Sequence, residues 1–566
     1  MCGIICEVCY SGKRIVHNDV KLLERIKNRG PDWINSTEFK LGDGITIYFY
    51  GSVLWMQGHE PTKQPVETEL GILLYNGDVF DESWVSQESD TKLIMDKLYN
   101  ATNISSEQII KEIKSIKGPF SLIYYNKLTQ DLFFARDKLG RNSMLLHKNN
   151  GSLIISSVLG RNYECIEVPA SHICILNINN NIMKLVSWNC GLSYEKTCDD
   201  WILSVKEQQN LPDDEFVISF DEILELNDEE NLVKYIENVV ENATGKLNIM
   251  KRLINHQTIN ETVSKIIDLL QKSVEIRLRQ QPNKCKQCLH DNNLICSHCA
   301  VGILFSGGLD CSILALMADK YLPEDQEIDL INVAFKKENS SSYEVPDRQT
   351  GKQSLQELQK LCPSRKWVFK EVNISREELE KMQKSVIADL VYPRLTILDE
   401  SLGSALWFAA KGEDEKGRSL SRVLLLGSGA DELFGGYIRH RNAYKRKGWS
   451  GLSKELLLDW SRISLRNLAR DNRVICDHGR QPRMPYLDEE FSKFVLGLKP
   501  WLRCFPAENL ENGIGDKLIL RLVAYKLGLI EAAILPKRAL QFGSRIANKK
   551  EKGSDFSKTF FNKPLP

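Results

Sequence analysis

The sequence predicts two folded units, a β-rich α+β domain followed by an α/β domain built on a parallel sheet. In the first third, β-rich runs bounded by turn residues occupy 45–55, 71–75 and 120–125. In the second half, an apolar run at 301–305 breaks into glycines and continues with helical spacing. The same order of strand, glycine turn and helix recurs at 423–437. Repeated alternation of strand and helix indicates a parallel sheet whose strand ends share one crevice.

The bulk composition is that of a soluble globular protein. The 566 residues suffice for two to four domains, and 42% of them are hydrophobic and 27% charged. The 75 basic and 75 acidic residues cancel, so the charge balance predicts no nucleic-acid partner. No apolar run approaches the ~20 residues of a membrane span, and the first residues lack a signal-peptide pattern. We therefore expect a cytoplasmic protein without membrane attachment, whose 15 cysteines are mainly reduced thiols.

The chain begins Met-Cys-Gly, which places a thiol second in the sequence. If the initiator Met is removed, Cys2 carries the free α-amino group, and this amine has a reference pKa near 8. A thiol beside such an amine has its own general base, as in N-terminal nucleophile hydrolases. Any chain can begin Met-Cys, so Cys2 becomes informative only together with the motifs that follow.

Those motifs are, in chain order, Arg29-Gly-Pro-Asp32, Asn76-Gly-Asp78, Ser89-Asp90, Gly118-Pro-Phe-Ser121 and Arg136-Asp-Lys-Leu-Gly140. This succession resembles the class II glutamine amidotransferase domain, a four-layer N-terminal nucleophile hydrolase sandwich with two central sheets, over residues 2–190. The resemblance implies that Cys2 attacks the glutamine amide, that Asn76 and Gly77 form the oxyanion hole, and that Asp90 holds the substrate's α-amino group. The alternatives are a turn at Asn76-Gly77 and a helix N-cap at Asp90.

One position departs from the amidotransferase pattern. The family's arginine for the substrate's α-carboxylate falls at or near Val53, within Gly51-Ser-Val-Leu-Trp55. Loss of contacts of about 1.5 to 3 kcal/mol per hydrogen bond weakens glutamine binding at least tenfold unless another base replaces that arginine.

Residues 191–257 carry no chemical constellation and are acidic between 213 and 241, which predicts a solvated linker or insertion. Residues 258–284 begin with an amphipathic pattern, which predicts a helix that packs on the second domain. We assign the second domain to 300–546 and a polar tail to 547–566.

A cysteine-rich loop, 285–299, contains two C-x₂-C pairs separated by seven residues: Cys285, Cys288, Cys296 and Cys299. Four thiolate or imidazole ligands in a tetrahedron hold structural Zn²⁺, with His290 and His298 as rival ligands. The gap is shorter than in a standard zinc ribbon, so free thiols in an exposed loop remain the alternative.

The run Val301 to Ser312 predicts a buried strand, a glycine turn and a helix. Such a turn presents backbone N–H groups and a helix N-terminus to an anion such as a nucleotide phosphate. It lacks the GK[ST] ending of a Walker A loop, and Asp310 beside a phosphate implies an intervening Mg²⁺. Serine-glycine-glycine-x-aspartate resembles the pyrophosphate loop of ATP pyrophosphatases, whose Rossmann-like fold places Val333, on a strand at 328–335, beside adenine. An ordinary strand-turn-helix corner is the alternative.

Together with the SGGLD loop, three segments further along the chain, GADELFGG, RMPYLD and PKRALQFGS, extend this resemblance to the asparagine synthetase family. Its reaction activates aspartate with ATP as β-aspartyl-AMP, which ammonia released from glutamine then converts to asparagine. The resemblance implies ATP and Mg²⁺ as cofactors, aspartate and glutamine as substrates, and Mg²⁺ on Asp310 and Asp431. The residues implied to bind ATP or pyrophosphate are Ser306, Gly307, Gly308, Asp310, Ser312, Val333, Gly427, Gly429, Asp431, Lys537 and Arg538.

A second departure concerns the family's Gly-Glu-Gly-Ser-Asp-Glu, which here contains Ser428 in place of the first glutamate. A carboxylate there is placed to take a proton from attacking ammonia, and a serine hydroxyl is too weak a base to replace it. Cys311 replaces the usual serine, a milder change. Three functions follow as hypotheses: a glutamine-dependent, attenuated asparagine synthetase; an ammonia-using carboxylate-adenylating enzyme with an inactive glutaminase half; and a non-catalytic scaffold.

Overall fold

The computed structural model describes residues 2–10, 14–81, 89–188, 193–208, 230–282, 284–289, 296, 298–336, 342–507, 510, 513–547 and 552–560. The predictions that involve His290, the acidic stretch before 230 and the last six residues of the tail lie outside these ranges. Within them, no helix is both long enough and apolar enough to cross a membrane.

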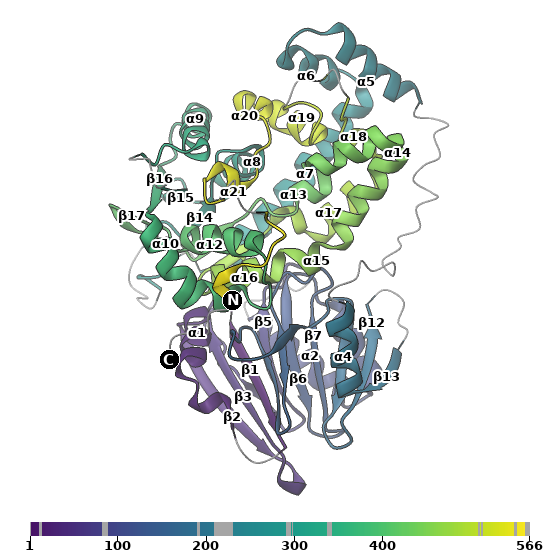
Figure 1. The fold of residues 1–566 in the computed structure, drawn as a ribbon, viewed down its shortest axis with the longest axis vertical. Helices are drawn as coiled ribbons and strands as arrows, with labels where there is room; N and C mark the ends of the chain where they lie inside the picture. The colour runs from purple at the N-terminus through teal and green to yellow at the C-terminus, as the bar shows by residue number, and fades with distance from the viewer. Residues whose placement is uncertain are drawn as a thin grey trace.

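The first unit is a sandwich of two antiparallel sheets (Figure 1). One sheet has the order β10 (Cys165–Glu167), β8 (Leu145–Lys148), β9 (Ser152–Ser156), β1 (Gly3–Cys9), β3 (Thr46–Val53), β2 (Trp33–Lys40). The other has the order β13 (Ser193–Thr197), β12 (Ile182–Ser187), β11 (His172–Asn177), β7 (Asp131–Arg136), β6 (Phe120–Asn126), β5 (Gly71–Gly77), β4 (Val66–Glu67). The predicted β-rich runs correspond to β3, β5 and β6.

Helices cover both outer faces, which gives the predicted four layers. Apolar side chains from both sheets, among them Cys6, Phe49 and Phe134, fill the space between the sheets. On one outer face lies α1 (Val20–Arg29), preceded by the short turn η1 (Val16–Asn18); on the other lie α2 (Asp90–Thr102) and α3 (Ser106–Ser115). Ile94 and Ile109 of those two helices pack against β5 and β6. A second short turn, η2 (Gly42–Gly44), precedes β3.

The stretch 191–257 differs from the solvated insertion that its charge predicts. Its beginning belongs to the sandwich, because β13 pairs with β12 and α4 (Cys198–Gln208) inserts Trp201 into the core between the sheets. Its end forms α5 (Glu230–Asn242) and α6 (Lys246–Ile254), whose apolar faces, including Ile236 and Met250, are buried against the second unit. The described acidic residues of α5, such as Glu237 and Glu241, lie on the exposed face of a packed amphipathic helix.

The second unit is built on a five-stranded parallel sheet. Its order is β16 (Trp367–Ile374), β15 (Ile328–Phe335), β14 (Val301–Leu304), β19 (Val423–Leu425), β20 (Gln481–Arg483). The first strand in the chain, β14, lies in the middle, and later strands are added first on one side and then on the other. Strand order reverses between β14 and β19, where ligands bind in open α/β sheets, outside the carboxyl ends of the strands.

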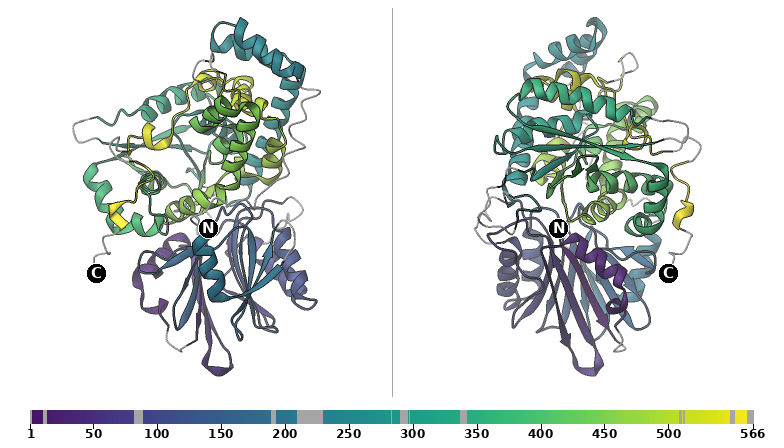
Figure 2. Two further views of the ribbon diagram at one scale, coloured as in Figure 1. Left: turned by 45° about the vertical axis from the view of Figure 1, so that its right-hand side comes forward. Right: turned by 90° about the vertical axis from the view of Figure 1, so that its left-hand side faces the viewer.

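Helices cover both faces of this sheet (Figures 1 and 2). One face packs against the predicted amphipathic helix α7 (Gln257–Arg279), α8 (Leu309–Asp319) and α9 (Pro346–Leu361), with α17 (Glu489–Leu496), α18 (Pro500–Arg503), α19 (Leu518–Lys526) and α20 (Ile530–Ile534) beyond them. The other face packs against α10 (Arg376–Met382), η5 (Gln383–Ile387), α11 (Ala388–Val391), α12 (Ile397–Lys411) and α16 (Leu468–Cys476). The remaining elements are β17 (Glu413–Asp414), β18 (Gly417–Arg418), α13 (Ala430–Phe434), α14 (Ile438–Ser461), α15 (Ile463–Arg466), η6 (Pro485–Leu487), α21 (Leu540–Gly543) and η7 (Lys558–Phe560).

The two units share a continuous apolar core. Ile5, Leu22 and Ile26 of the sandwich belong to the same buried cluster as Ile331 and Phe408 of the α/β unit. The amino-terminal end of β1, which directly follows Cys2, lies at this boundary (Figure 2).

Buried ion pairs cross the same boundary. Arg483 Nε and Nη2 each lie 3.2 Å from a different carboxylate oxygen of Asp78, and both side chains are fully buried. Arg473 Nη1 lies 2.9 Å from Glu167 Oε1. Two sequence motifs, Asn76-Gly-Asp78 and Arg483-Met-Pro-Tyr-Leu-Asp488, are thus joined through a bidentate contact.

Candidate active sites

Cys2 lies in a small pocket at the boundary of the two units. Its side chain is buried, and Gln64 Nε2 lies 3.6 Å from Sγ. The Tyr75 backbone N–H donates to Gln64 Oε1 at 2.7 Å and fixes the amide in this orientation. The described residues that line the pocket are Cys2, Val53, Leu54, Trp55, Met56, Gln57, Thr62, Gln64, Tyr75, Gly77, Ser89, Asp90 and Thr91.

The environment of Cys2 keeps its sulfur protonated. Burial raises the pKa of the thiol, and the chain's α-amino group and a backbone hydrogen bond from Leu54 oppose that rise only in part. The nucleophile is the thiolate, so attack on an amide needs a base that takes the proton from Sγ. The free α-amino group of a processed Cys2 is such a base, as the sequence predicts.

The structure places the two predicted oxyanion residues differently. Gly77 lines the pocket, and it ends β5 in register with Phe120 rather than forming a turn. Asn76 is fully buried and its Nδ2 donates to Ser121 Oγ at 3.1 Å, so this amide is not among the groups that line the pocket. Its Oδ1 has no hydrogen-bond partner in the described part of the chain. The role of Asn76 stays a prediction, which requires the amide to turn when substrate binds.

Asp90 is the charged residue of the pocket. It is the first residue of α2, whose N-cap is Ser89, so the N-cap alternative for Asp90 does not hold. Its Oδ1 accepts hydrogen bonds from Thr91 N at 2.6 Å and Thr91 Oγ1 at 3.2 Å. Burial, with a smaller repulsion from Asp78, raises the pKa of this carboxyl from 3.8 to about 7. Such a group ionises most readily when a cation, such as an α-amino group, enters beside it.

Among the described residues lining the pocket, no lysine, arginine or histidine accompanies Asp90. Val53, the position predicted to depart from the amidotransferase pattern, is buried and lines the pocket. The described lining therefore offers an anion for an ammonium group and no cation for a carboxylate.

The predicted phosphate loop lies at the strand-order reversal, between β14 and α8. Gly307 has φ +75°, and a Cβ on it would lie 2.5 Å from the backbone of Gly351. Only glycine fits such a position without strain. Gly308 caps α8, and Asp310 lies in the first turn of that helix. The second predicted turn, at Gly427 to Asp431, lies directly opposite after β19, and a Cβ on Gly427 would lie 2.9 Å from Asp310 Cβ.

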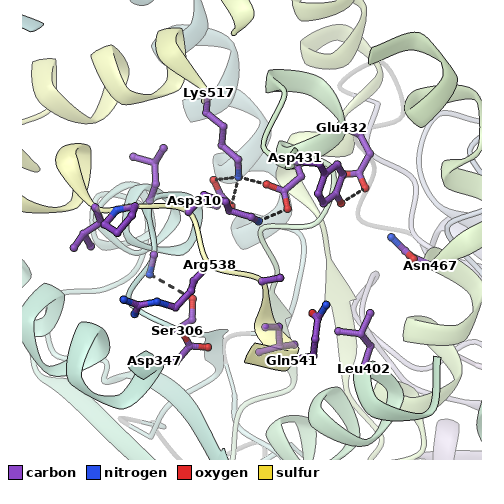
Figure 3. Close-up of a pocket in the computed structure, with 18 of the residues that line it drawn as sticks. Ser306, Asp310, Asp347, Leu402, Asp431, Glu432, Asn467, Lys517, Arg538 and Gln541 are labelled. Carbon is purple, nitrogen blue, oxygen red and sulfur yellow. Dashed lines mark hydrogen bonds and ion pairs between the residues drawn. The ribbon is translucent and has the colours of Figure 1, made fainter. Parts of the chain in front are cut away.

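Two carboxylates meet two lysines between these turns (Figure 3). Lys517 Nζ lies 2.8 and 2.7 Å from the two oxygens of Asp310 and 2.5 Å from Asp431 Oδ1. Lys537 Nζ also pairs with Asp431. Although burial opposes ionisation, both lysines hold the pKa of Asp431 well below its ordinary range, and the two carboxylates raise the pKa of buried Lys517. Asp431 and Lys517 are therefore both ionised at neutral pH.

These charged residues line one end of a two-part cavity. The polar part has a volume of about 450 Å³ and includes Asp310, Asp431, Lys517, Lys537 and Arg538. The apolar part has about 200 Å³ and is lined by Leu304, Ile331, Val333, Ala405, Ala409 and Leu426, with Ser428 at its edge. Ser306, Gly308, Asp310 and Asp347 line both parts. A nucleotide fits this arrangement, with its flat nucleobase in the apolar part and its polyphosphate in the polar part.

The other residues predicted to bind the nucleotide differ in whether they line the cavity. Arg538 lines the polar part, where its Nη1 lies 3.4 Å from Thr350 Oγ1. Ser312 does not line the cavity: its hydroxyl is buried and lies 3.5 Å from the Gly307 carbonyl, so it supports the loop from behind. Gly429 has φ +94° and serves as the turn before α13.

Sequence reasoning missed Lys517 and Asp347. Lys517 comes far along the chain, directly before α19, in no recognisable motif. Asp347 lies at the start of α9, and burial raises the pKa of its carboxyl to about 7 despite nearby Arg538 and Lys537. Its only signal is its place in the Val345-Pro-Asp turn that begins the helix.

The cysteine-rich loop brings together three of the four predicted thiols. Cys285, Cys288 and Cys296 form a compact group with His298. The prediction of Cys299 as the fourth ligand is wrong in this geometry: its Sγ lies 2.8 Å from the Val301 carbonyl, inside the core. Cys299 is adjacent to β14 and turns inward with that strand, whereas His298 turns toward the other thiols.

Comparison with known proteins agrees with the division into two units. The sequence model of the family described as asparagine synthase matches residues 294–449 and 442–556, and that of a glutamine amidotransferase domain matches 54–161. The chain thus has the domain organisation of an asparagine synthetase-like glutamine amidotransferase, and it belongs to the asparagine synthetase family.

Relatives that match over nearly the whole chain narrow the comparison within this family. The chain is 40% identical to an asparagine synthetase domain-containing protein of Drosophila melanogaster, over 98% of this chain and 99% of that protein. It is 35% identical to asparagine synthetase domain-containing protein 1 of Homo sapiens, over 98% and 97%. A putative glutamine-hydrolysing asparagine synthetase of Methanocaldococcus jannaschii is 30% identical over 47% of this chain and 50% of its own. A solved glutamine phosphoribosylpyrophosphate amidotransferase of Bacillus subtilis, 10% identical, with TM-score 0.24 and coverage of 62% and 70%, is too distant to carry an argument.

Proposed function

We propose that this protein is a glutamine-dependent amide ligase that converts aspartate, ATP and glutamine into asparagine, AMP, pyrophosphate and glutamate. One observation supports it most: the carboxyl ends of β14 and β19 present Asp310 and Asp431 to one cavity, where Lys517 and Lys537 neutralise them. A site with this charge balance binds a metal-complexed triphosphate and releases pyrophosphate.

In the nucleotide half, the backbone N–H groups of the Ser306-to-Gly308 turn and the N-terminus of α8 bind phosphate. The two carboxylates fit Mg²⁺, because hard cations take oxygen donors and both groups already bind a shared cation, the Lys517 ammonium. Asp310 and Asp431 would hold this ion, which would supply positive charge beside the phosphates. Lys517 and Lys537 then pair with the pyrophosphate oxygens.

The acceptor would occupy the far end of the polar cavity, where Arg439 and Arg466 are among the lining residues. Arg439 Nε lies 2.6 Å from Asp459 Oδ2, a contact that holds the guanidinium in place. A dicarboxylate such as aspartate needs a cation for the carboxylate that does not react, and these arginines provide it.

In the glutaminase half, Cys2 Sγ forms a bond to the amide carbon of glutamine while its proton passes to the α-amino group of processed Cys2. The amide nitrogen takes that proton and leaves as ammonia, and water then releases glutamate from the thioester. Asp90 would bind the substrate's α-amino group, and Gly77, which lines the pocket, would donate its N–H to the developing oxyanion.

A second candidate is a carboxylate-adenylating enzyme that uses free ammonia. The absence of a basic side chain among the described residues of the Cys2 pocket favours it, because glutamine's α-carboxylate then enters without a partner.

The test is a paired assay on purified protein whose intact mass shows removal of Met1. We expect glutamate release from glutamine that is abolished by Cys2→Ala, and aspartate-dependent AMP and pyrophosphate formation that is abolished by Asp310→Ala. Asp325→Ala, an exposed carboxylate beyond α8, is the control. Pyrophosphate formation with ammonia but no glutamate release selects the second candidate. A protein that binds no ATP with Mg²⁺ refutes both and leaves a scaffold.

A further inference from the structure

The group of Cys285, Cys288, Cys296 and His298, here called the Cys₃His cluster, lies away from both sites. Cys285 and Cys288 follow α7, and Cys296 and His298 directly precede β14. The cluster therefore lies at the amino ends of the parallel strands, on the opposite edge of the sheet from the nucleotide cavity.

The distances within the cluster are those of a tetrahedral metal site. His298 Nδ1 lies 3.7 Å from Cys285 Sγ, 3.5 Å from Cys288 Sγ and 3.8 Å from Cys296 Sγ. All four ligand atoms lie within 4.8 Å of one another. A zinc ion with bonds of about 2.3 Å to sulfur and about 2.0 to 2.1 Å to nitrogen separates tetrahedral S and N ligands by about 3.6 Å.

The surroundings of the cluster are those of a ligand set. The Cys285 backbone N–H lies 3.4 Å from Cys296 Sγ, the kind of hydrogen bond that stabilises a coordinating thiolate. Gln326 Nε2 donates to the His298 carbonyl at 3.3 Å and holds the backbone of that residue. Cys285 and Cys288 are buried, Cys296 is partly exposed and His298 is exposed. Four protein ligands leave no open coordination position, as in structural zinc sites.

We propose that the Cys₃His cluster binds one structural Zn²⁺. Soft thiolates with one imidazole in a tetrahedron select zinc over magnesium or calcium, which take oxygen ligands. Three thiols and one imidazole also exceed what a single disulfide would use. His298 completes the set that Cys299, turned into the core, does not.

The ion would fasten the turn after α7 to the boundary between the two units. The Lys286 backbone N–H donates to the Leu420 carbonyl at 3.1 Å. Two residues further, the guanidinium of Arg422 lies 3.0 Å from Asp32 Oδ2 and also contacts the Trp55 carbonyl. Asp32 Oδ2 accepts from Trp55 N at 2.8 Å, and Trp55 lines the Cys2 pocket. Zinc thus holds the turn against the loop that supports one wall of that pocket.

The test is elemental analysis of the full chain, purified without chelators from zinc-supplemented cells. We expect about one equivalent of zinc per chain, under about one-fifth in Cys288→Ser and His298→Ala, and about one in Cys299→Ser. Cys299 is the matched control, because it is the next residue to His298 and a thiol of the same loop. His298→Cys should keep the metal as a Cys₄ site.

If the cysteine variants do not fold, the wild-type protein decides alone. A mercurial thiol reagent should release about one equivalent of zinc, measured with a colorimetric chelator, and cobalt-grown protein should show the absorption of tetrahedral thiolate-bound Co²⁺. Wild-type protein with less than about one-tenth equivalent of zinc, or equal metal loss in Cys299→Ser and Cys288→Ser, overturns the proposal. None of these readouts depends on catalysis.

Discussion

Replacing the buried carboxylate of the Cys2 pocket, Asp90→Asn, should stabilise the protein in a pH-dependent way. The asparagine keeps the Oδ1 acceptor for Thr91 N and Thr91 Oγ1, and it removes the charge whose burial is unfavourable. In wild-type protein the pKa of this carboxyl rises from 3.8 to about 7 on folding.

The sign follows from proton linkage. Between the two pKa values the folded state holds a proton that the unfolded state has lost, so wild-type stability falls as pH rises through that window. The rise from 3.8 to about 7 makes wild-type protein less stable than the variant by about 2 kcal/mol at pH 5 and about 4 kcal/mol at pH 8. Below pH 4 the two proteins converge, and above about pH 7 the difference is constant.

Calorimetric melting at several pH values measures this difference directly. A free-energy difference of about 1 kcal/mol shifts Tm by about 2 to 4 °C in a domain of this size, so the gain should roughly double between pH 5 and pH 8. Asp96→Asn, an exposed carboxylate on the same helix, is the control and should show no such trend. An Asp90→Asn gain that is equal at the two pH values would mean that the carboxyl is not buried as described.

The same substitution should separate stability from function. Without the carboxylate, a substrate's α-amino group loses a charge-assisted contact of about 1.5 to 3 kcal/mol, so KM for glutamine should rise about tenfold or more. A variant that is more stable at pH 8 and binds glutamine unchanged would remove Asp90 from the substrate site.

Three further predictions concern the nucleotide half and the boundary. Ser428→Glu places a carboxylate in the lining of the apolar cavity, and the rate of ammonia-dependent asparagine formation should rise by a factor of about 10² or more. Ser428→Gln is the uncharged control, and equal rates for the two variants argue against a base at this position. Lys517→Met removes the ammonium that Asp310 and Asp431 share, so the free energy of unfolding should fall by about 3 to 5 kcal/mol. Added Mg²⁺ should recover part of this loss, and identical melting with and without Mg²⁺ contradicts metal binding there. Asp78→Ala leaves the Arg483 guanidinium buried without its bidentate partner and should lower the free energy of unfolding in urea by about 3 to 5 kcal/mol. Asp96→Ala, at an exposed carboxylate, is the reference, and equal urea midpoints for the two variants would refute a buried pair.

Local patterns predicted the elements that carry their own periodicity. The strand predicted at 328–335 is β15, and the strand-turn-helix at 301–318 is β14 and α8. The four-layer sandwich, by contrast, followed from a resemblance over ordered motifs. The charge of 191–257 did not reveal its folded ends, β13 with α4 and α5 with α6, because a helix with a narrow apolar stripe and an acidic outer face has the composition of a solvated segment.

Long-range partners were beyond local reasoning. Nothing near Lys517 in the sequence indicates that it reaches Asp310, about two hundred residues earlier. The choice between His298 and Cys299 depends on which side chain turns inward as β14 begins, and a C-x₂-C count does not contain that information. Likewise, the pairing of Asp78 with Arg483 gives each motif a partner that neither reveals alone.

The apolar core shared by the two units restricts how the protein can move. Because Ile5 and Ile26 pack in the same cluster as Ile331 and Phe408, a hinge rotation of one unit against the other would open that core to water. Such opening costs about 25 cal/mol for each Å² of apolar surface exposed. We therefore expect the two pockets to stay at a constant separation through turnover, so that any signal between them travels by small side-chain rearrangements at the boundary rather than by domain closure.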